Sequence, residues 1–337
     1  MNSITSPELL AQVNPKNTEL KNEFLSYLKA INRSDGTIYQ YNSDLDIFFC
    51  WVLQYADNKE FAKITKRDII AYQGWLINEN GNSPARVRRM KSTISSLSNF
   101  CENILADEEE DYASFRSIVR KIENPPMQAV REKTVWEDEE IEALLQKLTE
   151  QKQYEKACVL ALGIYSGRRK AELCRFRVSD FDDDKLVCGG ALYKSDPIKT
   201  KGRGDGKMIP CYTLAKKFKP YLDNWLKARE EKDIDSEWLF TDPAKPTEPI
   251  TISLLNSWAN TFSRMSGRDF YWHSLRHAFT TSLAKAGIPD GVIQSIVNWE
   301  SADMVRLYKD IDADEEIGMY FRDGEIVVPE KKTLSDL

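Results

Sequence analysis

Histidine is scarce in this chain of 337 residues, which contains two, and the sequence lacks the marks of several protein classes. No apolar run reaches the ~18 residues that a membrane-spanning helix requires. The first residues show no basic segment followed by an apolar one, so we expect no secretory signal. The sequence also has no phosphate-binding glycine loop and no zinc-ligand spacing. These absences predict a protein without a membrane span and without a metal ion or other cofactor.

The six cysteines are scattered and form no Cys-x-x-Cys pair. Cys50, Cys101 and Cys158 fall within apolar helical patterns, which is typical of buried thiols. Reduced thiols persist in a reducing compartment, so we expect the protein in the cytoplasm.

The net charge of −6 is concentrated at one end of the chain. Residues 310–337 carry nine acidic and three basic side chains, whereas residues 1–309 carry 44 of each sign. The net charge therefore does not exclude a nucleic-acid partner, because a local basic face decides such binding.

Length and residue pattern predict two domains in a mainly α fold with a small antiparallel β-sheet. The pair Pro125-Pro126 stands in a polar, aperiodic stretch that we interpret as a linker. The predicted organisation is a flexible leader (1–17), an N-terminal helical domain (18–124), a linker (125–133), a second domain (134–309) and an acidic tail (310–337).

Helix starts are indicated by capping residues in the first domain. Thr65 is a good N-cap, and Ser83 followed by Pro84 is another. In the second domain we expect a buried helix over 154–165 and short strands over 185–213. Further helices are expected at about 213–230, 250–266, 273–286, 289–298 and 301–309.

The region 271–308 holds both histidines among residues suited to phosphoryl transfer. A phosphodiester under attack gains negative charge on its non-bridging oxygens, which forked guanidinium groups match well. Arg169, which follows a glycine turn upstream, and Arg276 are candidates for that phosphate clamp. Tyr308 is the candidate nucleophile.

The leaving 5′-oxygen needs a proton, and the phosphate needs further donors. Lys201, in a basic hairpin, is a candidate for the mobile acid. His273 is a candidate proton carrier or phosphate donor, and Trp299 offers its indole N–H. Glu172 lies one helical turn after Arg169 and is placed to orient either His273 or an arginine.

These motifs resemble the tyrosine recombinases, the family of phage integrases and chromosome dimer resolvases. The family pattern T/S-G-x-R-x-x-E-L matches residues 166–173, and H-x-L-R-H-x-F-A/T-T matches residues 273–281. The His/Trp element nine residues before the nucleophilic tyrosine matches Trp299 and Tyr308. The resemblance covers residues 18–321, and its four elements at matching spacing are highly specific.

Two details depart from the family pattern. Asn298 stands where a glycine usually precedes the His/Trp position. The hairpin is one residue longer than the commonest form, so both Lys201 and Lys199 stay open as the catalytic lysine, with Lys201 favoured.

The resemblance implies a site-specific DNA recombinase whose two domains form a C-shaped clamp on DNA. It implies a 3′-phosphotyrosyl intermediate, four protomers on two inverted-repeat sites, strand exchange through a Holliday junction, and a mobile-element origin. Accessory DNA-bending proteins stay open. The segment after Tyr308 is expected to form a short helix that docks on a neighbouring protomer. Because the predicted leader covers only residues 1–17, we expect no extra arm-binding domain of the kind that larger integrases carry.

The resemblance also places the fourth N-terminal helix in the major groove, where arginine reads guanine edges. Arg86 and Arg89, on the polar face of that helix, become candidates for DNA contact rather than solvated side chains. Lys199, Arg203 and Lys207 are further candidates, although Arg203 and Lys207 are equally compatible with a solvated hairpin.

Several residues have a plainer interpretation. We expect Arg168 to be solvated and His277 to be structural rather than catalytic. Trp299 is also compatible with the core, and Tyr320 is a rival tyrosine at the wrong offset. Two other functions stay open for the whole chain: a type IB topoisomerase-like enzyme, and a DNA-binding protein without catalysis.

Overall fold

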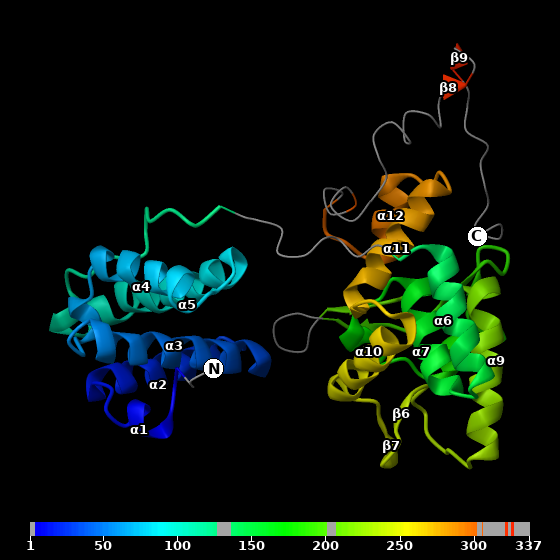
Figure 1. Cartoon of the computed structure of the whole chain (residues 1–337), viewed down its shortest axis with the longest axis horizontal. Helices are drawn as coiled ribbons and strands as arrows, with labels where there is room; N and C mark the ends of the chain where they lie inside the picture. Colours follow the sequence, from blue (N-terminus) through cyan, green and yellow to red (C-terminus); the bar gives the residue numbers. More distant parts are fainter. Residues whose placement is uncertain are drawn as a thin grey trace. The chain divides into compact units, whose positions relative to one another are not determined.

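The computed structural model describes residues 4–126, 136–200 and 207–301, position 305, and the backbone of two short strands near the C-terminus. The chain divides into two compact units, residues 1–132 and residues 133–337 (Figure 1). Within the described residues, no helix combines the length and the apolar character needed to cross a membrane.

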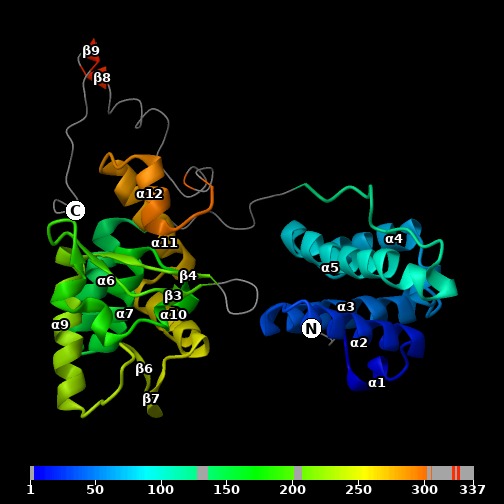
Figure 2. The same ribbon diagram turned by 180° about the vertical axis from the view of Figure 1, so that it is seen from behind.

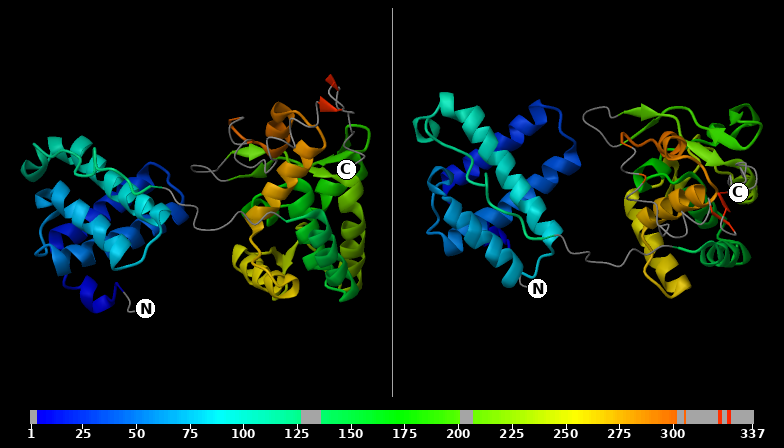
Figure 3. Two further views of the ribbon diagram at one scale, coloured as in Figure 1. Left: turned by 45° about the horizontal axis from the view of Figure 1, so that its top comes forward. Right: turned by 90° about the horizontal axis from the view of Figure 1, so that it is seen from above.

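Within residues 4–126, the regular secondary structure of the N-terminal unit consists of helices. Its helices begin where the capping residues predict: Thr65 and Asp68 form a capping box, and Ser83 accepts from Arg86 N ahead of Pro84. The helices cross one another at clear angles (Figure 3). The elements are α1 (Pro7–Leu10), α2 (Pro15–Ala30), α3 (Asp35–Tyr55), α4 (Lys66–Asn78) and α5 (Pro84–Asn103), with 3₁₀ turns η1 (Phe61–Lys63), η2 (Leu105–Asp107) and η3 (Glu110–Tyr112).

The prediction of a flexible leader over residues 1–17 is wrong for its described part. Helix α1 lies within it, α2 begins at Pro15, and Val13 is buried in the core. Asn17 is also buried, donating to Lys59 O at 2.8 Å and accepting from Phe61 N at 2.7 Å. Two cap-plus-proline pairs, Ser6-Pro7 and Asn14-Pro15, start these helices, and neither signal was used in the prediction.

Helix α5 also anchors the chain that leads towards the predicted linker. Arg88 donates from Nε and Nη2 to Pro125 O at 3.1 and 2.8 Å. Lys91, which is buried, donates from Nζ to Gln73 Oε1 at 2.6 Å and to Glu123 O at 2.9 Å. Both cations donate to backbone carbonyls that lie outside any helix or strand. These bonds fix the segment up to Pro125 to the N-terminal unit.

The C-terminal unit is a helical body with small antiparallel strands. The three-stranded sheet has the order β1-β2-β5, and β3 pairs separately with β4 (Figure 2). Its helices are α6 (Asp138–Glu150), α7 (Tyr154–Ser166), α8 (Lys170–Leu173), α9 (Ala215–Glu231), α10 (Ile252–Ser266), α11 (Trp272–Lys285) and α12 (Asp290–Val297), with 3₁₀ turns η4 (Val178–Phe181) and η5 (Asp183–Lys185). Its strands are β1 (Leu186–Val187), β2 (Leu192–Lys194), β3 (Ile198–Lys199), β4 (Met208–Ile209), β5 (Tyr212–Leu214), β6 (Thr241–Asp242), β7 (Lys245–Pro249), β8 (Phe321–Arg322) and β9 (Glu325–Ile326).

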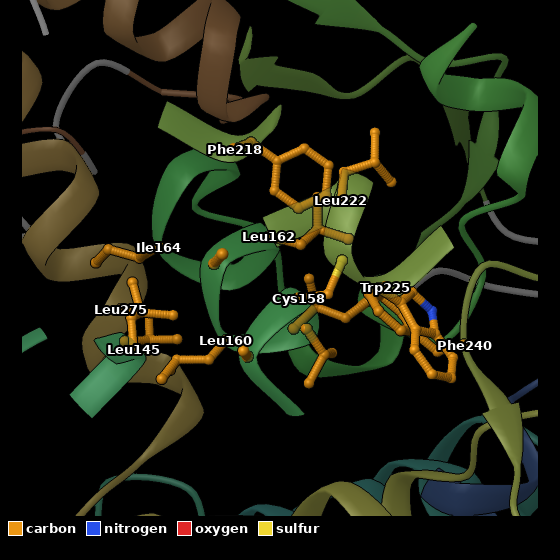
Figure 4. Close-up of a cluster of buried hydrophobic side chains, with 14 of the residues drawn as sticks. Leu145, Cys158, Leu160, Leu162, Ile164, Phe218, Leu222, Trp225, Phe240 and Leu275 are labelled. Carbon is orange, nitrogen blue, oxygen red and sulfur yellow. The ribbon is translucent and has the colours of Figure 1, made fainter. Parts of the chain in front are cut away.

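Helix α7 runs through the core of this unit. Its residues 157–164 are buried on every side, which fits a helix that is apolar all round. Figure 4 shows Cys158, Leu160 and Leu162 among side chains from other helices, including Phe218 and Trp225. A helix held in this way gives the segment that follows Ser166 a fixed starting point.

The thiols agree with the sequence prediction. All six cysteines are free, and Cys50, Cys101, Cys158 and Cys211 are buried.

The predicted helix over 213–230 needs one correction: residues 212–214 form β5, because they pair with β2, and the helix begins at Ala215. The hairpin of β6 and β7 was not predicted.

Candidate active site

The turn after α7 is built around Gly167. This residue caps the helix with φ +60°, a left-handed conformation that costs a non-glycine residue about 1–2 kcal/mol. A Cβ at this position would lie 2.4 Å from Cδ1 of Phe279 on α11. Both the backbone conformation and the close approach of α11 therefore require glycine.

Arg169, two residues further on, is fixed by Glu172. Glu172 Oε2 accepts from the backbone N of Arg169 at 3.0 Å, and Oε1 accepts from its Nη1 at 3.2 Å. The Glu172 side chain is 1% exposed and that of Arg169 is 39% exposed. Of the two roles predicted for Glu172, the structure thus shows the contact with an arginine. A buried carboxylate holds one edge of the guanidinium while the rest stays accessible.

Arg168 is not the solvated residue that we expected. It is 1% exposed and donates to Ser166 O at 3.2 Å, to Cys211 Sγ at 3.6 Å and, through Nη2, to Ile296 O. The last carbonyls of α7 and α12 have no intrahelical partners and carry partial negative charge. The Arg168 guanidinium satisfies them, so this residue joins the ends of two helices.

Arg276 on α11 also connects the ends of α7 and α12. It is 1% exposed and donates from Nη1 to Gly167 O at 2.8 Å and from Nη2 to Val297 O at 3.0 Å. Its guanidinium carbon lies 4.8 Å from the ring centroid of Trp299, within cation–π range. Arg276 therefore brings the glycine turn, the end of α12 and the indole of Trp299 to one place.

The turn after α12 explains the departure at Asn298. Asn298 has φ +63° and caps α12 in the left-handed region, which glycine and asparagine tolerate best. Trp299 N then donates to Gln294 O at 3.0 Å, and Gln294 Nε2 donates back to Trp299 O at 3.1 Å. Trp299 is buried in a cluster with Phe279. The core interpretation of this tryptophan is therefore confirmed, its contact with Arg276 was not predicted, and its role as a phosphate donor stays a prediction.

The two histidines lie on one side of α11, with ring centroids 5.6 Å apart and planes at 86°. His273 is exposed and His277 half-buried. Partial loss of solvent, followed by the positive charges of His277, Arg276 and Arg169, lowers the pKa of His273. A neutral imidazole at pH 7 follows, which offers one donor and one acceptor nitrogen.

The structure describes the two strands of the basic hairpin, up to residue 200 and from residue 207. Lys199 is exposed in β3, and its carbonyl accepts from Arg175 Nη1. Thr200 donates from N and from Oγ1 to the carbonyl of exposed Lys207, each at 2.9 Å. Lys201 and Arg203 lie outside the described residues, so the choice between Lys201 and Lys199 stays a prediction. Tyr308, Tyr320 and the predicted docking helix also lie outside them.

In the N-terminal unit, Arg86 and Arg89 are not simply solvated. Both bind Asp44 Oδ1, Arg86 from Nη1 at 3.0 Å and Arg89 from Nη2 at 3.3 Å. Asp44 was missed by sequence reasoning, although its position gives a signal. It lies three residues after Tyr41 and four before Phe48, so an acid falls on the apolar stripe of α3.

Comparison with known proteins identifies the family of the chain. Residues 135–315 match the phage integrase family, and residues 20–111 match the phage integrase N-terminal SAM-like domain. The chain therefore belongs to the phage integrase family, the tyrosine recombinases. It is 32% identical over 251 residues to the SPbeta prophage-derived recombinase-like protein YomM of Bacillus subtilis, covering 74% of this chain and 72% of that protein. It is 23% identical over 304 residues to tyrosine recombinase XerA of Pyrococcus horikoshii, covering 87% of this chain and 89% of that protein.

Solved structures share the fold at low identity. The XerH site-specific recombinase bound to palindromic difH substrate matches with a TM-score of 0.65 and 18% identity, covering 91% of this chain and 89% of that one. A lambda integrase dimer bound to a COC′ core site matches with a TM-score of 0.61 and 17% identity, covering 96% and 85%. The predicted family and the predicted mainly helical fold with small antiparallel strands are thereby confirmed.

Proposed function

We propose that this member of the tyrosine recombinase family cleaves and rejoins DNA through a 3′-phosphotyrosyl intermediate with Tyr308 as nucleophile. One observation carries the proposal. Arg276 binds the carbonyls of Gly167 and Val297 and stacks on Trp299, so the candidate phosphate-binding residues of two distant motifs are gathered at one site. Arg169 stands on the same glycine turn, held by Glu172.

The chemical step follows from the residue types. The Tyr308 oxygen attacks the scissile phosphorus while its proton passes to His273, the bond from phosphorus to the 5′-oxygen breaks, and a 3′-phosphotyrosyl ester forms. Lys201 gives the leaving oxygen its proton, so a free 5′-hydroxyl results. Arg169 and Arg276 stabilise the charge on the non-bridging oxygens.

His273 and Trp299 add donors to the same phosphate. The lowered pKa of His273 keeps its imidazole neutral near pH 7, so one ring nitrogen donates while the other accepts a proton. The reverse step uses the 5′-hydroxyl of a partner strand as nucleophile and releases Tyr308. Because the tyrosyl ester conserves the energy of the phosphodiester, we propose that neither ATP nor a metal ion is needed.

We further propose that four protomers act on two inverted-repeat sites and exchange strands through a Holliday junction in the cytoplasm. Related structures support this assembly: one holds XerH on palindromic difH substrate, and another holds a lambda integrase tetramer on a Holliday junction. Each protomer would close its two domains around the duplex as a C-shaped clamp. Residues 310–337 would dock on a neighbour, and accessory bending proteins would assist on some sites.

A covalent-trapping assay tests the proposed chemistry. The protein is incubated, in the presence of a metal chelator, with nicked duplexes drawn from the DNA that flanks its gene, and denaturing gels report any protein–DNA adduct. We expect an adduct with the wild type and with Tyr320→Phe, the matched control, and none with Tyr308→Phe. Loss of the adduct in Tyr320→Phe alone would refute the assignment of the nucleophile.

Three further assays separate the alternative functions: plasmid relaxation, native-gel binding and the joining of two duplexes. A type IB topoisomerase-like enzyme would relax supercoiled plasmid as a monomer and join no partner strand. A DNA-binding protein without catalysis would shift the duplexes in native gels and give no adduct from any variant. Joint molecules between two labelled duplexes would support recombination over both alternatives.

A further inference from the structure

Asp44 is the one acidic side chain that is fully buried within residues 4–126. It lies in the middle of α3, with 1% of its side chain exposed. Charged groups are rarely buried in this way unless they are paired. Packing alone therefore does not explain why a carboxylate stands at this position.

Four side chains donate to its carboxylate. Oδ1 accepts from Gln40 Nε2 at 3.0 Å, from Arg86 Nη1 at 3.0 Å and from Arg89 Nη2 at 3.3 Å. Oδ2 accepts from the Thr93 hydroxyl at 3.2 Å, and Thr93 is itself fully buried. Three of the four donors come from α5, so the carboxylate ties the polar face of α5 to α3.

The cluster is poorly explained as a device for stability. Burial raises the pKa of Asp44, although Arg86, Thr93 and Gln40 oppose that rise. A buried ion pair often contributes less stability than apolar side chains of the same volume. The two arginines, by contrast, keep 27% and 43% of their side chains exposed. Each long side chain is thus fixed at its inner edge and open at its outer edge.

We propose that Asp44 is a positioning residue that holds Arg86 and Arg89 ready for contact with double-stranded DNA. The inference rests on the proposed function and on the predicted contact of these two arginines with DNA. A free arginine loses rotamer freedom when it binds, whereas an arginine already held by a carboxylate loses less. Preorganisation matters most for base edges, because bidentate arginine–guanine bonds need a fixed fork.

This role predicts two effects of opposite sign for Asp44→Asn. Removing a negative charge beside the binding face strengthens non-specific binding, which is largely electrostatic. Releasing the arginines weakens selective binding. The ratio of selective to non-specific affinity should therefore fall about tenfold, the order expected for one weakened arginine–guanine pair.

The experiment uses the full chain and two fluorescent duplexes. One duplex is selected by the wild type from a randomised pool, and the other is an unselected duplex of the same length. Titrations at two salt concentrations give the affinity ratio and the salt dependence. Asp46→Asn is the matched control, because Asp46 lies on the same helix and undergoes the same charge change. Its partners are Lys21, at 2.5 Å, and the Asn42 amide, at 3.1 Å, and neither is an arginine.

The double variant Arg86→Ala/Arg89→Ala separates the inference from the proposed function. If the double variant keeps the wild-type ratio, the arginines do not read base edges, and the predicted contact on which the inference depends fails. If the double variant loses the ratio while Asp44→Asn keeps it, the contact stands and the positioning role is overturned. Support requires that Asp44→Asn lower the ratio, that Asp46→Asn leave it unchanged, and that Asp44→Asn add nothing to the double variant.

Thr93→Val covers the case in which Asp44→Asn does not fold, as judged by circular dichroism. It removes one support of the carboxylate while keeping the charge and the approximate volume. We expect a smaller fall in the affinity ratio and an unchanged salt dependence. An unchanged ratio in a folded Thr93→Val protein would overturn the positioning role in that case.

Discussion

Replacing Gly167 with alanine tests whether the turn after α7 is fixed by backbone conformation alone or also by contact with α11. The left-handed φ of +60° is expected to cost alanine about 1–2 kcal/mol. The new Cβ would also meet Phe279 Cδ1 at 2.4 Å, and overpacking of this kind costs about 1–3 kcal/mol. The free energy of unfolding should therefore fall by about 2–5 kcal/mol.

Gly267 supplies a control with the same backbone requirement and no steric one. It caps α10 at φ +75°, and nothing lies within 4 Å of a Cβ built there. Gly267→Ala should therefore show only the conformational cost, about 1–2 kcal/mol. Urea denaturation of each full-length variant, followed by tryptophan fluorescence, measures the difference.

Two further measurements sharpen the test. Because Gly167 O accepts from Arg276, a shift of this turn displaces the guanidinium, and covalent adduct formation should slow far more in Gly167→Ala than in Gly267→Ala. Phe279→Leu makes room for the new methyl group, so the double variant should lose less stability than the sum of the single variants. Equal losses in the two alanine variants, or strict additivity with Phe279→Leu, would refute the steric part of the reasoning.

Other residues allow equally direct tests. Arg168→Met should cost about 3–5 kcal/mol, because it leaves helix-end carbonyls buried without a donor; a urea midpoint near that of the wild type would show that the guanidinium is dispensable. Burial raises the pKa of Glu155 to about 7, so stability carried by its protonated form is fully present below about pH 4 and is lost as the pH rises through 7. Between pH 5 and pH 8 the free energy of unfolding of the wild type should fall by about 3 kcal/mol more than that of Glu155→Gln. An equal pH dependence in the two proteins would contradict this prediction. Asn298→Gly should keep the stability of the wild type while Asn298→Ala loses about 1 kcal/mol, and thermal unfolding of both variants distinguishes this from a side-chain requirement.

The fold was predictable where local chemistry decides it. Thr65 and Ser83 start their helices as capping rules require, and the apolar run before Ser166 forms the buried α7. The same capping rules explain α1 and α2, so the mistaken leader reflects a signal passed over rather than one absent. Strand β5 was predicted only in part. The expected strands over 185–213 include Tyr212 and Thr213, whereas Leu214, expected in the following helix, pairs with Leu192 of β2, and no local pattern indicates that pairing.

The sequence indicates candidate residues for the site but not the side chains and carbonyls that hold them. Motif spacing indicated Arg169, Arg276 and Trp299, and the structure brings two of them into direct contact. Arg168 looked solvated because its partner Ile296 lies 128 residues away in the sequence. Asp44 has its arginines 42 and 45 residues further along the chain. Burial of a charge depends on such distant partners, which single-sequence patterns do not contain.

The paired helix ends have a consequence for the time at which the site can form during synthesis. Arg168 binds the carbonyl of Ile296, 128 residues later, and Arg276 binds Gly167 O, 109 residues earlier. A ribosome adds about 5–20 residues per second, so the first motif waits for roughly ten seconds before its partners exist. During that interval Nη2 of Arg168 lacks its acceptor on Ile296, and the carbonyl of Gly167 lacks its donor on Arg276. A nascent chain that ends before α12 therefore cannot form the candidate active site.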